Sequence, residues 1–366
     1  MRRVAQEQLG FGFGAAEPVV LPLPVIQPEP EPVVEDVQTA VGPEAIDETP
    51  APAPASEPDP EPEPELEPDP EPELEAPTPG APVPANPPLK YPGGKAKLAP
   101  TILPFLGLDD RRDSVLVEPF VGAGAVSLLA LARGFRGTLI LADADLNIMA
   151  LWETLYREPE ALKDYLRTLP TSEITEVEYL IRRERFRHVV SPIERAGLLL
   201  WLNKTNYNGL HRYSKKAGYN AHWGKYTTWN LTAALATVDR CHALLSRALL
   251  VKFFDDAIPA LAHSGSWDRV SIYVDSPYLG GFAGYTAAGF KRADHDRLSN
   301  TLRGLPERVR IVLSHVDNAA ADEVYGWMTK EVIGEASRQI NRDGAGRGKV
   351  VEVVFCSSAV GWEGAP

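Results

Sequence analysis

EPFVGAGAVSL, residues 118–128, joins an apolar run to a helical pattern through a turn that contains Gly122 and Gly124. The run DSVLVEPF (113–120) predicts a strand before the turn, and AVSLLALARG (125–134) predicts a helix after it. Glycines let a backbone approach a ligand closely, and a helix N-terminus favours a negative group there. Ser127 stands where a dinucleotide fingerprint has its third glycine, so the turn alone is as compatible with simple packing as with ligand binding.

Similar apolar runs recur along the chain and alternate with helical stretches. Strands that are almost continuously apolar and separated by helices predict an α/β fold with a mostly parallel sheet covered on both faces. Ligands in such folds bind at the carboxyl ends of the strands. The further strands are expected at GTLILADAD (137–145), ALLVKFFDD (248–256), VSIYVDSPY (270–278), VRIVLSH (309–315) and KVVEVVFCS (349–357).

The first quarter of the chain differs in composition from the rest. Residues 1–88 contain 23 of the 34 prolines, 19 acidic residues and 2 basic ones. This segment cannot bury enough apolar surface to offset its chain entropy, so we expect a long disordered tail with polyproline II character. Since the whole chain carries a net charge of −13, the remainder carries +4 and suits a polyanionic partner. The tail then serves either as a solubilising linker or as a competitor for the basic face.

Several classes of protein are disfavoured by the composition. The two cysteines, Cys241 and Cys356, fit no metal-binding spacing, and no run of eighteen apolar residues predicts a membrane span. Without a signal-peptide pattern after Met1, these features favour a reducing cytoplasm. The segment QLGFGF (8–13) loosely resembles peptides that bind bacterial sliding clamps, with an inert chain end as the alternative.

The pattern changes between residues 157 and 240. Helical stretches at 160–169, 176–190 and 193–205 lead into NYNGLHRYSKKAGYNAHWGKYTTWN (206–230), which is dense in Lys, Arg, Tyr, Trp and Asn and has an Asn-Gly turn signal at 208–209. We interpret 157–240 as an inserted domain and 89–156 with 241–366 as the main one. In the insert, cations suit phosphates, and Asn and aromatic side chains suit base edges. The cations are Lys204, Arg212, Lys215, Lys216 and Lys225, with Asn208 in the turn.

Two further residues accompany the glycine turn. Asp143 ends the next predicted strand about twenty residues on, where an acid can accept hydrogen bonds from both hydroxyls of a ribose. Alternatively, Asp143 or Asp145 caps the following helix. Lys95 follows Gly93 and Gly94, in a flexible turn that delivers an amine to a carboxylate or phosphate, or simply leads into a helix.

The stretch YVDSPYLGG (273–281) places polar groups and a ring directly after a strand. The Asp275 carboxylate and the Ser276 carbonyl can accept both hydrogens of an exocyclic amine, which frees the nitrogen lone pair for attack. Tyr278 offers a face on which a planar base can stack. This set suits transfer of an electrophilic carbon to an aromatic amine better than hydride transfer.

In order along residues 89–358, the chain resembles the Dam-type DNA adenine-N6 methyltransferases. The resemblance rests on YPGGK, EPFVGAGAVS, LADAD, NKTNYNGLHRYSKKAGYNAHWGKY, YVDSPY, YTAAGFKRADHDRLSNTLR, IVLSHVD and VVEVVFCS. It implies a Rossmann-like sheet with an inserted, mainly helical target-recognition domain. It also implies S-adenosylmethionine as cofactor, double-stranded DNA as substrate, and a bacterial or phage-encoded enzyme of the cytoplasm.

The resemblance also assigns roles to individual residues. Asp275, Ser276, Pro277 and Tyr278 match the catalytic tetrad. The matched cofactor residues are Tyr91, Lys95, Glu118, Pro119, Phe120, Gly122, Gly124, Asp143 and, in addition to its catalytic role, Asp275, with Asp255 or Asp256 near the cofactor's adenine.

The chain departs from the family pattern at two places. Ser276 stands where the tetrad usually has proline, and YNAHWGKY replaces the usual asparagine-valine-proline pattern, so the DNA sequence recognised stays open. The alternatives are cytosine-N4 methylation, a catalytically silent DNA-binding relative and a nicotinamide-dependent oxidoreductase. The last leaves Asp275, Tyr278 and the basic segment unexplained.

Overall fold

The computed structural model describes residues 85–91, 94–108, 112–214, 218–264, 268–279, 290–337 and 349–357. The tail expected at 1–88, apart from its last four residues, lies outside these ranges. So do the QLGFGF segment (8–13), Lys215 and Lys216. In the described part of the chain, no helix is long and apolar enough to cross a bilayer.

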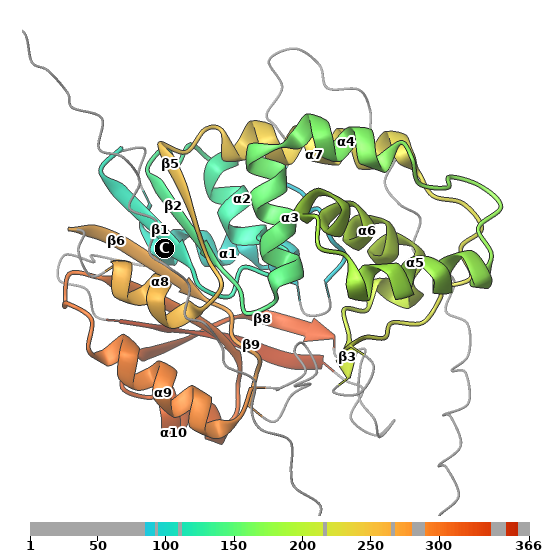
Figure 1. The fold of residues 1–366 in the computed structure, drawn as a ribbon. Helices are drawn as coiled ribbons and strands as arrows, with labels where there is room; N and C mark the ends of the chain where they lie inside the picture. The colour runs from blue at the N-terminus through green and yellow to red at the C-terminus, as the bar shows by residue number, and fades with distance from the viewer. Residues whose placement is uncertain are drawn as a thin grey trace, which may run out of the picture. The chain divides into compact units, whose positions relative to one another are not determined.

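A seven-stranded sheet with the order β5-β2-β1-β6-β7-β9-β8 organises the fold (Figure 1). Neighbouring strands from β5 to β7 run parallel, while β9 runs antiparallel to both β7 and β8. The mixed α/β fold with a mostly parallel sheet is therefore confirmed. The strands are β1 (Ser114–Glu118), β2 (Thr138–Ala142), β5 (Leu250–Phe254), β6 (Arg269–Val274), β7 (Arg310–Val316), β8 (Thr329–Ser337) and β9 (Lys349–Cys356).

The pattern of apolar runs does not reveal β8. Its sequence TKEVIGEAS mixes charged and apolar residues, and it pairs only with β9 at the edge of the sheet. Its register also shifts between Val332 and Gly334. An edge strand has a neighbouring strand on one side only, so its side chains are more exposed to solvent and polar residues are tolerated. It therefore lacks the continuous apolar run that marks the central strands.

Helices cover both faces of the sheet because alternate strand residues point to opposite sides. Leu116 of β1 packs in one buried cluster, and Val115 and Val117 pack in another. The first cluster includes residues of α1 (Ala99–Ile102), α2 (Ala125–Ala132), α3 (Leu146–Arg157) and α7 (Leu231–Leu245). The second includes residues of α8 (Ala257–Ser264), α9 (Arg292–Arg303) and α10 (Ala319–Tyr325).

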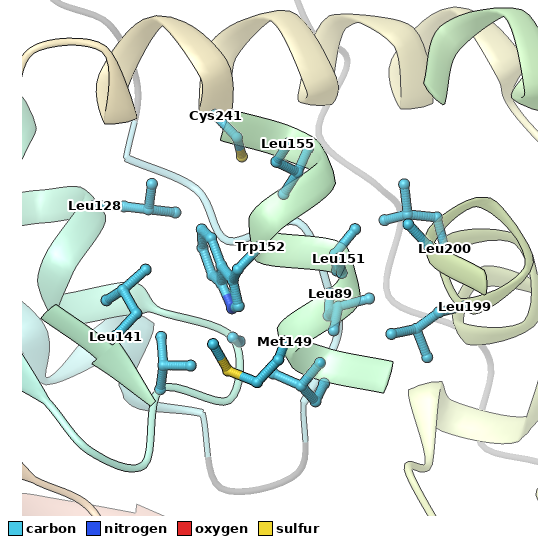
Figure 2. Close-up of a cluster of buried hydrophobic side chains, with 14 of the residues drawn as sticks. Leu89, Leu128, Leu141, Met149, Leu151, Trp152, Leu155, Leu199, Leu200 and Cys241 are labelled. Carbon is cyan, nitrogen blue, oxygen red and sulfur yellow. The ribbon is translucent and has the colours of Figure 1, made fainter. Parts of the chain in front are cut away.

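Trp152 is a central residue of the first cluster. Its side chain is fully buried, and Figure 2 shows the indole among Leu128 of α2, Leu141 of β2 and Cys241 of α7. Its Nε1–H donates to the Gly122 carbonyl at 2.9 Å. The packing of this core residue therefore fixes the glycine turn that follows β1.

The segment between α3 and α7 holds α4 (Pro159–Leu166), α5 (Glu176–His188), α6 (Pro192–Thr205) and a short antiparallel pair, β3 (Tyr213–Ser214) with β4 (Gly218–Tyr219). Thr175, Ser191 and Asn230 cap the starts of α5, α6 and α7 with their side-chain oxygens. Asn208 and Gly209 both have a left-handed backbone, as the Asn-Gly signal predicts, within the 3-10 turn Tyr207–Gly209.

Candidate active site

The polar residues predicted for the site follow three adjacent parallel strands. Glu118 ends β1, Asp143 follows β2, and Asp275 follows β6. β1 lies between β2 and β6, with Glu118 paired to Leu141 and Val117 paired to Ile272. Because the carboxyl ends of parallel strands meet at one edge of a sheet, the fold brings the three acids together, as the sequence predicts.

The turn after β1 has a backbone that requires glycine. Gly122 and Gly124 have φ angles of +44° and +66°, in the left-handed region. A Cβ on Gly124 would lie 2.4 Å from the Trp152 ring, and one on Gly122 would lie 3.4 Å from the Tyr91 ring. Gly122 is thus a shallow cradle beside an aromatic side chain.

Asp143 fastens this turn. Its Oδ2 accepts the Gly122 N–H and its Oδ1 accepts the Asp145 N–H, both at 2.9 Å. The helix cap that was the alternative role for Asp143 falls to Asp145, whose Oδ1 accepts the Asn147 N–H at 2.9 Å. Asp143 does not cap the helix. Its carboxylate lies at the end of β2 and faces the glycine turn.

Asp145 also contacts the segment between α3 and α7. The fully buried His211 bonds through Nε2 to Asp145 Oδ2, and Asn147 Nδ2 donates to the Tyr213 hydroxyl at 2.6 Å. Burial opposes ionisation of Asp145, but the bond and charge of His211 outweigh it and lower the pKa of Asp145. The base of the β3–β4 pair is thus bonded to the loop that carries Asp143.

Glu118 and Asp143 hold protons more tightly than exposed acids. Burial is the main cause, and it raises the pKa of Glu118 to about 8, against hydrogen bonds from the Ser127 N–H and hydroxyl. The charges of Asp275 and Asp143 add to this rise. Burial likewise raises the pKa of Asp143 to about 6, opposed by the N–H of Asp145. Glu118 is therefore mostly neutral at pH 7 in the free protein.

A lysine, an aspartate and a tyrosine form the centre of the site. Lys95 is 6% exposed, and its Nζ lies 3.1 Å from Asp275 Oδ1 and 4.9 Å from the centre of the Tyr278 ring. The Tyr278 hydroxyl shares its single proton between Glu352 Oε2 at 2.9 Å and Asp275 Oδ1 at 3.3 Å. Burial and the charges of both acids raise the pKa of Tyr278 well above its usual value, so this phenol stays a donor.

The comparisons with known proteins agree with this geometry. Residues 91–340 match the family model of D12 class N6 adenine-specific DNA methyltransferases. The chain belongs to this family. It is 29% identical over 275 residues to the DNA adenine methylase of Vibrio cholerae O395. This alignment covers 73% of this chain and 94% of that protein. The Escherichia coli K12 DNA adenine methylase is 28% identical over 282 residues, with 73% and 93% covered.

The chain is thus an adenine-specific DNA methyltransferase that methylates adenine at N6. Adenine was the base expected from the resemblance, and cytosine-N4 methylation was the alternative. The family match favours adenine.

Other predicted site residues of the methyltransferase lie around this centre. Pro119 is buried, and Phe120 is half-buried with its ring edge-to-face with Phe290 at 5.7 Å. Asp255 and Asp256 are exposed after β5, at the same sheet edge, and Asp256 Oδ1 accepts the Ile258 N–H of α8 at 2.9 Å.

The predicted DNA-contacting residues of the methyltransferase lie between the end of α6 and α7. Lys204 is on α6, Asn208 and Arg212 are exposed, and Lys225 is exposed with a φ of +60°. The aromatic residues of this segment divide by exposure. Tyr219 (2% exposed) and Trp229 (7%) are packed inside it, whereas Tyr207 is 41% exposed and available to a partner. The sequence pattern does not distinguish these two roles.

Four further contacts of the methyltransferase were not predicted. Glu352, on β9, bonds Tyr278, and His211 bonds Asp145. His315 accepts the Leu279 N–H. The Asn203 side chain accepts the Lys90 N–H and donates to the Lys90 carbonyl, both at 2.8 Å. Of these residues, only Glu352 could be recognised from the sequence pattern. It is a lone acid inside an apolar strand run, which is costly to bury unless the acid has a partner.

Replacing Glu118 by glutamine is expected to change how stability depends on pH. With a pKa of about 8 in the folded protein and 4.5 as its ordinary value, Glu118 binds its proton more tightly when folded. Its contribution to stability is therefore full below pH 4.5 and is lost as pH rises towards 8, at up to about 1.4 kcal/mol per pH unit. Glutamine does not titrate and keeps an acceptor for Ser127.

The measurement is urea unfolding of both proteins between pH 5 and 8. The free energy of unfolding of the wild type minus that of Glu118→Gln should fall steadily over this range. Titrating groups that do not interact with Glu118 are common to both proteins and cancel in the difference, so the slope reports Glu118 together with its coupling to Asp143 and Asp275. Parallel pH profiles would show that Glu118 is ionised in the free protein.

Proposed function

We propose that residues 89–366 transfer the methyl group of S-adenosylmethionine to N6 of an adenine flipped out of duplex DNA. The catalytic residues in this proposal are Asp275, Ser276, Pro277 and Tyr278. The proposal rests on the Asp275 carboxylate, which directly follows β6 and has the Tyr278 ring beside it. The Tyr278 hydroxyl is hydrogen-bonded to this carboxylate. A carboxylate with an adjacent aromatic ring provides both a hydrogen-bond acceptor and a stacking surface for a base.

The glycine turn and its acids fit S-adenosylmethionine. The cofactor is a cation with an ammonium group and a ribose, and the turn offers Glu118, Asp143 and the open cradle at Gly122 beside Tyr91. Asp143 would hold the ribose hydroxyls, and Glu118 with Gly124 would hold the methionine part. When bound, the cofactor supplies an electrophilic methyl group. Phe120 and either Asp255 or Asp256 would line its adenine end.

The target amine needs orientation more than a strong base. The Asp275 carboxylate and the Ser276 carbonyl would accept its two hydrogens, so that its lone pair points out of the ring plane. A neutral amine can attack and lose its proton afterwards, so Asp275 positions and polarises. Stacking on Tyr278, about 1–3 kcal/mol, would offset the few kcal/mol that flipping costs.

Lys95 occupies part of this site in the free protein. Its ammonium pairs with Asp275 and lies over the Tyr278 ring, two interactions that the target base would make instead. Entry of the base would therefore move Lys95 from the ring. The freed ammonium would stay close enough to balance the charge of Asp275.

Residues 157–240 would recognise the DNA. The exposed cations Arg212 and Lys225, with Lys204, suit phosphate contacts, and Asn208 suits a base edge. Lys215 and Lys216 are further phosphate candidates outside the described residues. The α5 residues Arg183 and Arg187 support this surface, since they donate to the Ala221 and Tyr219 carbonyls at 3.0 Å.

Expression in a methylation-free bacterial host, followed by base-resolved sequencing, should show N6-methyladenine at one short motif. A duplex with 2-aminopurine beside that adenine should then become brighter on binding, because the probe loses its stacked neighbour when the adenine flips out. Tyr278→Phe should keep this increase, whereas Tyr278→Ala should weaken it. N4-methylcytosine in the host DNA would refute the choice of base. Unchanged fluorescence during turnover would refute base flipping, and an undiminished increase in Tyr278→Ala would refute stacking on Tyr278.

A further inference from the structure

We propose that His315 and Asn318 are positioning residues for methyl transfer, which hold the catalytic turn by bonding both polar backbone atoms of Leu279. The inference rests on the proposed function, in which Asp275 to Tyr278 are the catalytic residues. Leu279 follows Tyr278 directly, so its backbone sets where the tyrosine ring and the end of the turn lie. Neither His315 nor Asn318 would touch the substrate in this arrangement.

His315 is fully buried at the end of β7 and has a defined tautomer. Its Nδ1 lies 2.8 Å from the Val316 carbonyl, which can only accept, so Nδ1 carries the proton. Its Nε2 is then an acceptor and receives the Leu279 N–H at 2.9 Å. The imidazole thus connects the backbone of β7 to the backbone of the catalytic turn.

Asn318 holds the other side of the same residue. Its Nδ2 donates to the Leu279 carbonyl at 3.3 Å, while its Oδ1 accepts the Ala321 N–H at 2.8 Å and caps α10. The amide is therefore oriented by the helix cap before it reaches Leu279. Both bonds come from residues 315–318, a rigid connection between a central strand and a helix.

The turn needs such outside support. Pro277 fixes its own φ and biases Ser276 towards an extended backbone, but Ser276 has no ring of its own to restrict its φ. The Tyr278 ring lies 4.7 Å from the His315 ring, and its hydroxyl is held by Glu352. With Leu279 held as well, Tyr278 is fixed at its ring, its hydroxyl and the following peptide. A displacement of about 1 Å can cost about 100-fold in rate, so these bonds should matter for kcat.

Two substitutions at His315 separate its bond from its packing. His315→Gln keeps an acceptor at similar reach for the Leu279 N–H but loses the ring. His315→Phe keeps a ring beside Tyr278 but leaves that N–H without its acceptor. If positioning is the role, kcat should fall at least about 30-fold in His315→Phe and only a few-fold in His315→Gln, with KM for DNA changed less than two-fold in both.

Asn318→Asp supplies a milder test at a half-buried position. Aspartate keeps the cap on Ala321 but loses the donor and faces the Leu279 carbonyl with a negative charge. We expect kcat to fall about 10-fold with little change in melting temperature, because a negative cap at the start of α10 offsets the lost bond. This variant keeps the inference testable even if His315→Phe folds poorly.

Ser314→Ala is the matched control. Ser314 is the fully buried neighbour of His315 on β7, and its hydroxyl bonds the Tyr273 hydroxyl at 2.9 Å instead of the turn. Loss of this bond should lower the melting temperature but leave kcat within about two-fold of the wild type. Steady-state kcat and KM, single-turnover rates and melting temperatures would be measured for all four variants.

The inference is overturned if kcat follows the melting temperature across the set, or if Asn318→Asp and His315→Phe both retain wild-type kcat. Failure of the underlying function is a separate outcome. If Asp275→Ala stays active in the same assay, the catalytic assignment is wrong, whatever His315 does.

Discussion

Asp275→Ala lowers the single-turnover rate of adenine methylation by about a hundred- to a thousand-fold, while the Kd for DNA changes little. This is the expected result if Asp275 orients and polarises the target amine, because the loss of one transition-state contact commonly costs 10² to 10³ in rate. The rate would be measured with radiolabelled cofactor on a duplex that contains the recognised motif.

This substitution also removes one ion-pair partner of the buried Lys95 ammonium, which can destabilise the protein. The double variant Lys95→Met with Asp275→Ala removes the buried cation as well. It should recover the lost stability but none of the lost rate. A double variant that regains activity would show that the single variant failed through misfolding, and the role of Asp275 would have to be abandoned.

Asp143→Asn is expected to weaken binding of S-adenosylmethionine by about 100-fold and to leave DNA binding intact. The carboxylate accepts two backbone N–H groups, and an amide offers only one acceptor oxygen. One N–H, of Gly122 or Asp145, then loses its partner at a cost of about 1–3 kcal/mol, and the site for the ribose hydroxyls is lost as well. Titration calorimetry measures the affinity.

Asp294→Asn is the control for this second prediction. Its Oδ2 also accepts a backbone N–H, from Lys291 at the start of α9, and the residue is not one of the proposed cofactor ligands. If both variants bind the cofactor equally well, Asp143 is only a support for the turn and is not a cofactor ligand.

The fold and the centre of the site were predictable because they depend on local patterns. The central strands are continuous apolar runs, and Glu118, Asp143 and Asp275 each follow one, so parallel strand order alone gathers them. The edge strand β8 lacks such a run. His315, Asn318 and Glu352 act on residues 36 to 74 positions away in the chain, and no spacing rule connects residues so distant.

The bonds between His211 and Asp145, and between Tyr213 and Asn147, affect how new sequence specificity can be engineered. In the proposed function, residues 157–240 recognise the DNA. A graft there that replaces His211 would change the side chain opposite Asp145, whose backbone N–H holds Asp143. We expect such a chimera to lose affinity for its methyl donor. Libraries that retain His211 and Tyr213 and vary only the exposed positions between residues 204 and 228 should avoid this loss.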